Sequence, residues 1–295
     1  MQDSERRVDS GYFFAAITLL IWSGFVIVSR KGGTSPLNPF DIAALRISTA
    51  ALVLSPWWLP RLLRPALRQL RWYQSLSFAL IAGIAYPLVA YFGFRHAPAG
   101  HGAVLISGML PFFTSLLAAV LLKERPGHVR LAGLCLILSG VVTLLWASHS
   151  GPATLMGDVI LLSASLLWSL FTVLLKVWKV RAFDVTLGVT AMSALIYLPV
   201  YLLFLPKHIA AASYGDIGLQ AFFQGFVVVC VAMWTYARAA EQLGSVKLVI
   251  LMSGVPVIGT LLAVPLLGEV LTPAAAIGTS LTFMGALLGA MAKQA

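Results

Sequence analysis

The sequence predicts an all-α polytopic membrane protein with ten transmembrane helices, arranged as two inverted five-helix repeats. Composition, ten apolar segments and an internal repeat together predict this fold class. Of the 295 residues, 60% are hydrophobic and only 10% are charged, with a mean hydropathy of +0.93. Soluble globular domains are about 45–50% apolar and about 25% charged. The composition therefore excludes a soluble enzyme, a disordered chain and a disulfide-rich secreted domain.

The chain contains ten apolar segments that are each long enough to cross a bilayer, which takes about 20 residues in a helix. Short connections containing proline, glycine and charged residues separate them, and none is large enough for a soluble domain. The predicted spans are 11–30, 39–59, 72–93, 99–122, 128–147, 155–177, 184–205, 217–237, 244–267 and 272–292.

Basic residues orient these spans. Ten spans place both termini on one side of the membrane, and 15 of the 20 Lys and Arg residues fall in the segments on that side, against four on the other. Cytoplasmic segments carry such an excess of basic residues. We therefore expect a multi-pass protein of a bacterial-type cytoplasmic (inner) membrane with both termini in the cytoplasm. The net charge of +10 has the same origin and does not indicate nucleic-acid binding.

An internal repeat divides the chain into two halves. A shift of 145 residues aligns spans 3–5 with spans 8–10 without a gap, and the most informative identical pairs are Pro111/Pro256, Glu124/Glu269, Gly133/Gly278 and Gly140/Gly285. The predicted units are an N-terminal segment 1–10, a first repeat 11–147, a connecting loop 148–154 and a second repeat 155–292. Since five is an odd number, the second repeat enters the membrane from the opposite side. Such inverted repeats are typical of secondary transporters, whose binding sites lie near the bilayer midplane.

Several motifs resemble those of the drug/metabolite transporter superfamily, in particular its ten-helix EamA-type exporters. They are Trp22-Ser-x-Phe25 in span 1, Ala-Leu-Arg46 in span 2, and Pro111 followed by Leu-Leu-Lys-Glu124 in span 4. The resemblance covers essentially the whole chain. It implies a central cavity lined by spans 1, 3, 4, 6, 8 and 9, with spans 5 and 10 as packing elements. Gly133 and Gly140 in span 5 fit that packing role.

Within this group the chain looks most like the YddG-type amino-acid exporters, because of Trp22, Trp168 and the pair Tyr86-Pro87. This narrower resemblance implies export of amino acids by alternating access.

Two tryptophans lie near mid-depth on repeat-related spans. Trp22 is in span 1 and Trp168 in span 6, whereas tryptophan usually lies at the membrane interface. Either they wall the substrate cavity or they are packing residues bonded to neighbouring carbonyls. Phe25 lies three residues after Trp22 and Phe171 three residues after Trp168, about one helical turn, so both would continue the same wall.

Two prolines occupy equivalent positions in spans 4 and 9. A proline inside a helix removes the hydrogen bond to the carbonyl four residues earlier, here Ser107 for Pro111 and Met252 for Pro256. The freed carbonyls could bind a substrate ammonium, or the kinks could bend during gating. A static kink is the alternative. The stripes Gly108-Pro111-Ser115 and Ser253-Pro256-Thr260 fall at helical spacing and are expected to face the cavity.

Five further residues are candidates for the cavity wall. His101 could bond a carboxylate or titrate near neutrality, although a lone histidine in such a position is usually structural. The remaining candidates are Tyr86, Met109, Met233 and Trp234.

Charged residues within the spans are few. Arg46 is the one basic residue well inside a span, and the resemblance favours an architectural role for it, with Asp41 as a possible partner. Glu124 and Glu269 lie at span ends and are expected to cap helices or bind loops. No Asp or Glu lies at mid-membrane, which argues against a proton-coupled antiporter of the small multidrug type.

The sequence therefore predicts a secondary transporter that exports amino acids (aromatic, neutral and related small metabolites), with the bilayer and a small-molecule substrate as its partners. An exporter of multiple drugs or quaternary cations is the alternative within transport. An intramembrane enzyme is the alternative from another class, but no nucleophile constellation, metal cluster or cofactor motif is present. No repeated polar stripe indicates a channel. Because both halves lie in one chain, a monomer suffices for a complete cavity; a homodimer is the alternative.

Overall fold

The computed structural model describes residues 2–64, 69–147 and 152–291. Within these ranges the chain is nearly all helical, without strands, and ten helical segments are long and apolar enough to cross a membrane. The predicted all-α polytopic fold class and the number of spans are confirmed.

Six of the ten spans are single helices: α1 (Gln2–Gly33), α2 (Pro39–Leu63), α7 (His128–Ala147), α8 (Pro152–Trp178), α9 (Ala182–Phe204) and α14 (Pro273–Met291). The other four are built from shorter pieces, several of them π-helical. Span 3 is α3 (Trp72–Phe78), η2 (Ala79–Ala85) and α4 (Tyr86–His96); span 4 is α5 (Ala99–Gly102), η3 (Ala103–Gly108) and α6 (Leu110–Leu121). Span 8 is α10 (Tyr214–Gln220), η5 (Ala221–Val231) and α11 (Ala232–Leu243); span 9 is α12 (Ser245–Met252) and α13 (Val255–Leu267), and a 3-10 turn, η4 (Ile209–Ala211), precedes span 8.

Local chemistry explains where α2 begins and where α13 ends. Asn38 and Asp41 form a capping box at the start of α2, and Pro39 stands at a first-turn position, where a proline lacks no helical hydrogen bond. Helix α13 ends at Gly268, whose φ of 68° is left-handed and favours glycine.

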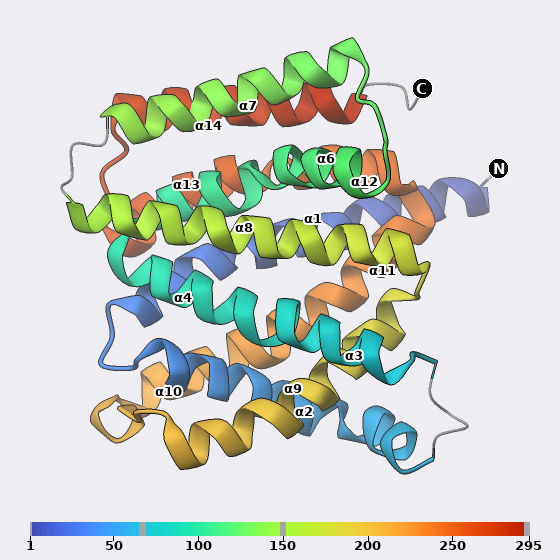
Figure 1. The fold of residues 1–295 in the computed structure, drawn as a ribbon. Helices are drawn as coiled ribbons and strands as arrows, with labels where there is room; N and C mark the ends of the chain where they lie inside the picture. The colour runs from blue at the N-terminus through green and yellow to red at the C-terminus, as the bar shows by residue number, and fades with distance from the viewer. Residues whose placement is uncertain (1, 65–68, 148–151, 292–295) are drawn as a thin grey trace.

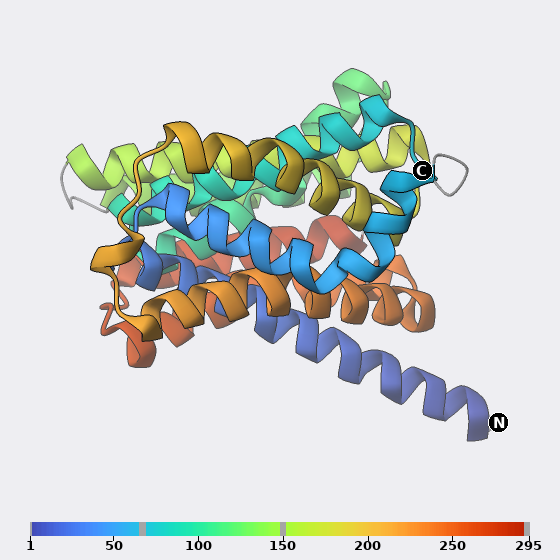
Figure 2. The ribbon, with the colours of Figure 1, turned by 90° about the horizontal axis from the view of Figure 1, so that it is seen from below.

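The helices pack side by side, with α7 and α14 together along one edge and α2, α9 and α10 along the other (Figure 1). Helix α1 begins, and α14 ends, at the same end of the bundle, which we call the terminal end; the opposite end is the far end. The first turns of α1 project beyond the other helices (Figure 2). The expected N-terminal segment 1–10 thus continues the first helix from Gln2. Of the expected connecting loop 148–154, residues 148–151 lie outside the described residues and the remainder begins α8.

Glycines bring α7 and α14 into close contact. A Cβ atom on Gly133 would lie 2.6 Å from the carbonyl oxygen of Gly285, and one on Gly140 would lie 2.6 Å from that of Gly278. Small residues allow such approach of membrane helices. The predicted packing role of spans 5 and 10 agrees with this seam, which joins two spans of the same chain.

The prolines of spans 4 and 9 do not kink continuous helices. Pro111 stands in the first turn of α6, after a break at Met109, and Pro256 in the first turn of α13, after a break at Ser253 and Gly254. The expectation of proline within a helix is therefore wrong. Each proline starts a new helix, where its missing N–H has no helical partner to lose.

Candidate functional site

A cavity lies inside the bundle and extends from mid-depth toward the terminal end. It holds about 710 Å³ of empty space, part of it open to the surroundings. The part contributed by α9 runs from Val185 to Ser193, the first half of a helix that begins at the terminal end. The lining residues are Trp22, Arg46, Ile47, Ala50, Ala82, Gly83, Trp168, Phe171, Val185, Thr186, Val189, Thr190, Ser193, Val228, Val229 and Met233.

Both central tryptophans line this cavity. The ring of Trp22 stacks on Tyr236 at 5.2 Å between centroids. The ring of Trp168 lies 4.6 Å from that of Tyr86 and 5.0 Å from that of Phe171. Each indole is thus held by a neighbouring aromatic ring while one face of the residue borders the empty space.

Hydroxyl groups from α9 provide much of the polar part of the wall. Thr186, Thr190 and Ser193 follow one another at spacings of four and three residues, which places them on one face of the helix. Ser193 is 1% exposed, and its Oγ has no hydrogen-bond partner within the described part of the chain. The predicted site residues did not include this face, although the spacing of its hydroxyls is visible in the sequence.

A layer of aromatic side chains lies on the far side of the cavity. The ring of Phe25 lies 6.2 Å from Tyr86, 6.5 Å from Tyr91 and 6.3 Å from Phe94, and all four residues are buried. These rings occupy the region between the cavity and the far end.

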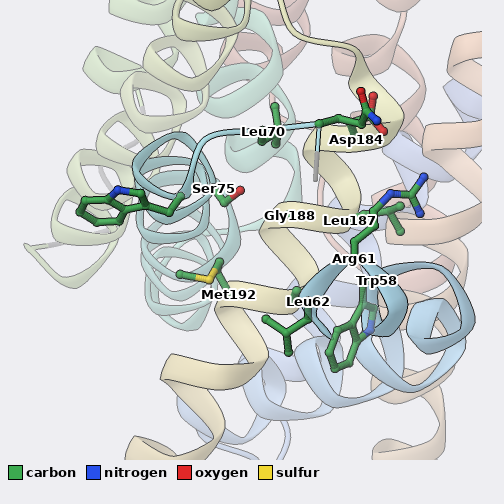
Figure 3. A pocket seen from close by; sticks show the side chains of 12 residues that line it. Trp58, Arg61, Leu62, Leu70, Ser75, Asp184, Leu187, Gly188 and Met192 are labelled. Carbon is green, nitrogen blue, oxygen red and sulfur yellow. The ribbon is translucent and has the colours of Figure 1, made fainter. Parts of the chain in front are cut away.

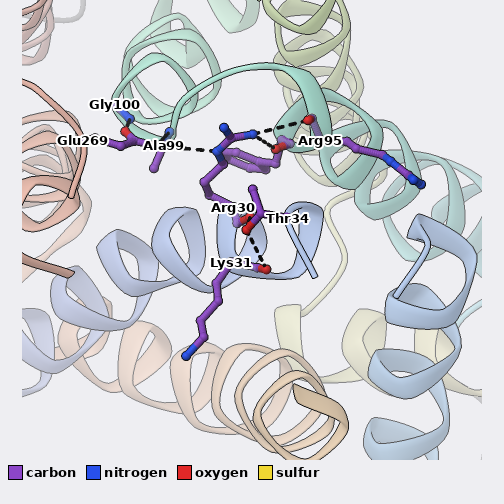
Figure 4. Close-up of polar contacts among 8 residues, drawn as sticks. Arg30, Lys31, Thr34, Arg95, Ala99, Gly100 and Glu269 are labelled. Carbon is purple, nitrogen blue, oxygen red and sulfur yellow. Dashed lines mark hydrogen bonds and ion pairs between the residues drawn. The ribbon is translucent and has the colours of Figure 1, made fainter. Parts of the chain in front are cut away.

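Glu269 ties three elements together at the far end (Figure 4). Its carboxylate accepts hydrogen bonds from the backbone N–H groups of Ala99 at 2.7 Å and Gly100 at 3.1 Å, the first residues of span 4. It also lies 3.6 Å from the Nε of Arg30 at the end of α1. Arg30 in turn donates to the carbonyl oxygen of Phe94 at 2.7 Å. The carboxylate therefore caps span 4 and joins it to span 1.

The repeat-related pair lies at the terminal end and differs in its contacts. A shift of 145 residues takes Glu269 to Glu124, and a shift of 146 takes Arg30 to Lys176. Lys176 and Glu124 do form an ion pair, but their side chains are 62% and 40% exposed, against 22% and 19% for Arg30 and Glu269. The N-cap residue of α12, the element equivalent to the start of span 4, is Gly244, which has no side chain that could cap the helix.

Comparisons with known proteins identify the family. The model of the EamA-like transporter family matches the chain twice, over residues 9–146 and 155–291. The chain belongs to the EamA-like transporter family.

Individual relatives are distant but cover almost the full length. An uncharacterized transporter of Archaeoglobus fulgidus is 27% identical over 94% of this chain and 96% of its own. A probable terminal-alkyne amino-acid exporter of Streptantibioticus cattleyicolor is 28% identical over 96% of this chain and 94% of its own. A solved crystal structure shares the fold with a TM-score of 0.63 at 22% identity, covering 95% of this chain and 96% of that one.

In this EamA-like transporter the cavity is lined by spans 1, 2, 3, 6, 7 and 8. Spans 4 and 9, which were expected to contribute, do not line this cavity. They fill the space between spans 1 and 6 and the α7–α14 pair: a Cβ on Gly108 would lie 2.4 Å from Thr282 of α14, and Thr260 contacts Thr279 of α14. The two proline stripes therefore face neighbouring helices and not the cavity. Ser107, Met109, Met252 and Ser253 lie on these spans and do not line the cavity.

Two other cavity candidates lie elsewhere. Trp234 is 54% exposed and packs its ring against Phe14, while its neighbour Met233 lines the cavity. His101 is buried at the far end, where its Nδ1 lies 2.8 Å from a carboxylate oxygen of Asp158. Phe25 and Tyr86 belong to the aromatic layer beside the cavity.

Arg46 lines the cavity and does not pair with Asp41. Its guanidinium donates to Oε1 of Gln224 at 3.4 Å, and Gln224 donates to the hydroxyl of Ser29 at 3.0 Å. Asp41 instead accepts from the hydroxyl of Tyr201 at 2.6 Å and takes part in the cap of α2. The expected contact between Asp41 and Arg46 is therefore wrong, because the cap turns the carboxylate away.

A second cavity lies at the terminal end, on the other face of α9 (Figure 3). Residues of α9 such as Asp184 and Gly188 border it, together with Trp58 and Arg61 of α2 and Trp72 of α3. Tryptophan beside arginine is typical of the membrane–water interface. This position separates it from the central cavity.

Proposed function

We propose that this EamA-like transporter exports amino acids and related small metabolites by alternating access, with its two halves inverted in the membrane. The central cavity supports this: aromatic rings and aliphatic side chains form most of its wall, and a few hydroxyls and one guanidinium supply polar contacts. Such a wall suits a small amphipathic molecule. One relative is a probable terminal-alkyne amino-acid exporter, which agrees with this substrate class.

The observation that carries the mechanism is the difference between the two repeat-related carboxylates. Glu269 caps span 4 and holds Arg30 at the far end, whereas Glu124 pairs with an exposed lysine at the terminal end. In the alternate state Glu124 takes the role of Glu269: it accepts from the N–H groups at the start of α12, and Glu269 releases span 4. The cavity then opens toward the far end.

A carrier of organic cations is less well supported. Among the described residues that line the cavity there is a guanidinium and no carboxylate. A buried cation in the wall repels a second cation, so the aromatic rings alone would have to compensate.

Reconstitution tests the proposal. The full chain in liposomes, loaded in turn with radiolabelled amino acids and with tetraethylammonium, should release neutral and aromatic amino acids and retain the quaternary cation. Release of the cation without release of any amino acid would overturn the proposal.

A further inference from the structure

The guanidinium of Arg46 is a buried charge in the middle of a membrane span. The residue is 9% exposed, lies well inside α2 and borders the central cavity. Arginine stays protonated in proteins, so this position carries a full positive charge. Such a charge within the membrane needs compensation and is a functional hypothesis by default.

The described residues supply no anionic partner for it. None of their ion pairs includes Arg46, which donates instead to the neutral side chain of Gln224. The nearest carboxylate in sequence, Asp41, already accepts hydrogen bonds from Asn38, Tyr201 and His208. Arg46 therefore borders the cavity without a carboxylate partner among the described residues.

A second polar group on the same cavity, the hydroxyl of Ser193, is buried without a hydrogen bond among the described residues. Ser193 is 1% exposed. The absence of a side chain at Gly83 makes room for it, since a Cβ there would lie 2.0 Å from the Ser193 Oγ. A buried hydroxyl without a partner is unfavourable unless a ligand completes its hydrogen bonds.

We propose that Arg46 and Ser193 together bind the carboxylate of the substrate. A guanidinium forms short, paired hydrogen bonds with a carboxylate, and the hydroxyl donates a further one. The carboxylate neutralises the charge of Arg46, and the apolar part of the substrate lies against Trp22 and Trp168. The inference rests on the proposed function and narrows it: the site selects molecules that carry a carboxylate and rejects the corresponding amines.

Binding to the purified full chain tests this with three probes of similar size, measured by isothermal titration calorimetry. They are L-phenylalanine, 3-phenylpropionate (which lacks the ammonium) and phenethylamine (which lacks the carboxylate). The wild-type protein should bind the first two and not the third. Arg46→Gln should weaken binding of both carboxylates by about 100-fold, and Arg46→Lys by about tenfold, since lysine keeps the charge but not the paired geometry.

Ser193→Ala should weaken carboxylate binding roughly fivefold to tenfold, in line with the loss of one hydrogen bond to a charged group. Ser139→Ala is the matched control, because Ser139 is exposed on α7 and bonds only within its own helix. It should bind as the wild type does.

The outcomes separate the two proposals. Binding of phenethylamine as tightly as L-phenylalanine, or unchanged carboxylate affinity in both Ser193→Ala and Arg46→Lys, overturns the assignment of the carboxylate site alone. If the Arg46→Gln protein melts at a much lower temperature than the wild type, its loss of binding reflects misfolding, and the affinities of Arg46→Lys and Ser193→Ala decide instead. A wild-type protein that binds none of the probes and releases no amino acid from liposomes overturns the proposed function.

Discussion

Replacing Glu269 with glutamine should open the far end of the cavity. The carboxylate of Glu269 accepts from two backbone N–H groups, at 2.7 and 3.1 Å, and lies 3.6 Å from Arg30. Glutamine keeps one acceptor oxygen, so one hydrogen bond is lost, the other becomes neutral and the ion pair disappears. A hydrogen bond to a charged group contributes about 1.5–3 kcal/mol, a neutral one about 1 kcal/mol, and a partly exposed ion pair about 0–1 kcal/mol. The closed far end should therefore be destabilised by about 3 kcal/mol.

A cysteine at Thr260 reports this change. Thr260 is 4% exposed and contacts Gly100 beneath the Glu269 carboxylate. With Cys135 and Cys230 replaced by alanine, the Thr260→Cys protein is treated with a membrane-impermeant maleimide from the far side. Because about 1.4 kcal/mol corresponds to a tenfold change in population, Glu269→Gln should raise the modification rate roughly 100-fold.

Glu124→Gln is the matched control, since it removes the repeat-related carboxylate. Its partner Lys176 and Glu124 itself are both largely exposed, so the pair contributes about 0–1 kcal/mol in this state. The modification rate of Thr260→Cys should not rise in this variant. Equal rates in the wild type and Glu269→Gln, or the same increase in both glutamine variants, would refute the reasoning.

Three further predictions follow from the packing around the cavity. Trp22→Ala and Trp168→Ala should each reduce amino-acid release from liposomes at least tenfold at unchanged membrane insertion, because aromatic contacts and buried area are lost. The control Trp146→Ala, at a position 82% exposed, should transport normally. Equal losses of release in all three variants that track the amount of folded protein would contradict a cavity role. Gly140→Ala should lower the unfolding free energy by about 1–3 kcal/mol, since its Cβ would lie 2.6 Å from a carbonyl of α14; an unchanged melting temperature would contradict this. His101→Ala should destabilise the fold by about 1–3 kcal/mol, because it removes a hydrogen-bond partner of the buried Asp158 carboxylate. Both the wild type and this variant should still release amino acids when a protonophore collapses the pH gradient; a protonophore-sensitive wild type made insensitive by His101→Ala would contradict this.

The span count and the mid-depth tryptophans could be predicted from the sequence. Ten apolar segments separated by turn residues leave one consistent count, and the place of Trp22 and Trp168 within their segments gives their depth. Hydropathy identifies the segment that crosses the membrane, and the place of a residue within that segment gives its depth. The packing of α7 on α14 followed from glycines, because only small residues permit that approach.

The direction in which each residue points could not be predicted. Lipid and cavity are both apolar, so neighbouring residues such as Met233 and Trp234 carry no signal that separates the one lining the cavity from the one that is 54% exposed. The expectation that spans 4 and 9 line the cavity came from the family resemblance and not from the direction of any residue. Arg46 lost its expected partner because Asp41 bonds to Tyr201, a residue 160 positions away that no local pattern connects to it.

A disulfide across the far end tests the alternating-access account most directly. A Cβ on Gly100 would lie 3.5 Å from Cγ2 and 3.9 Å from Oγ1 of Thr260, so the sulfur atoms of two cysteines at these positions would be neighbours. In a background without Cys135 and Cys230, the double variant Gly100→Cys, Thr260→Cys should release no amino acid from liposomes when oxidised and should recover release when reduced. Release by the oxidised, cross-linked protein at the rate of the reduced form would contradict the account.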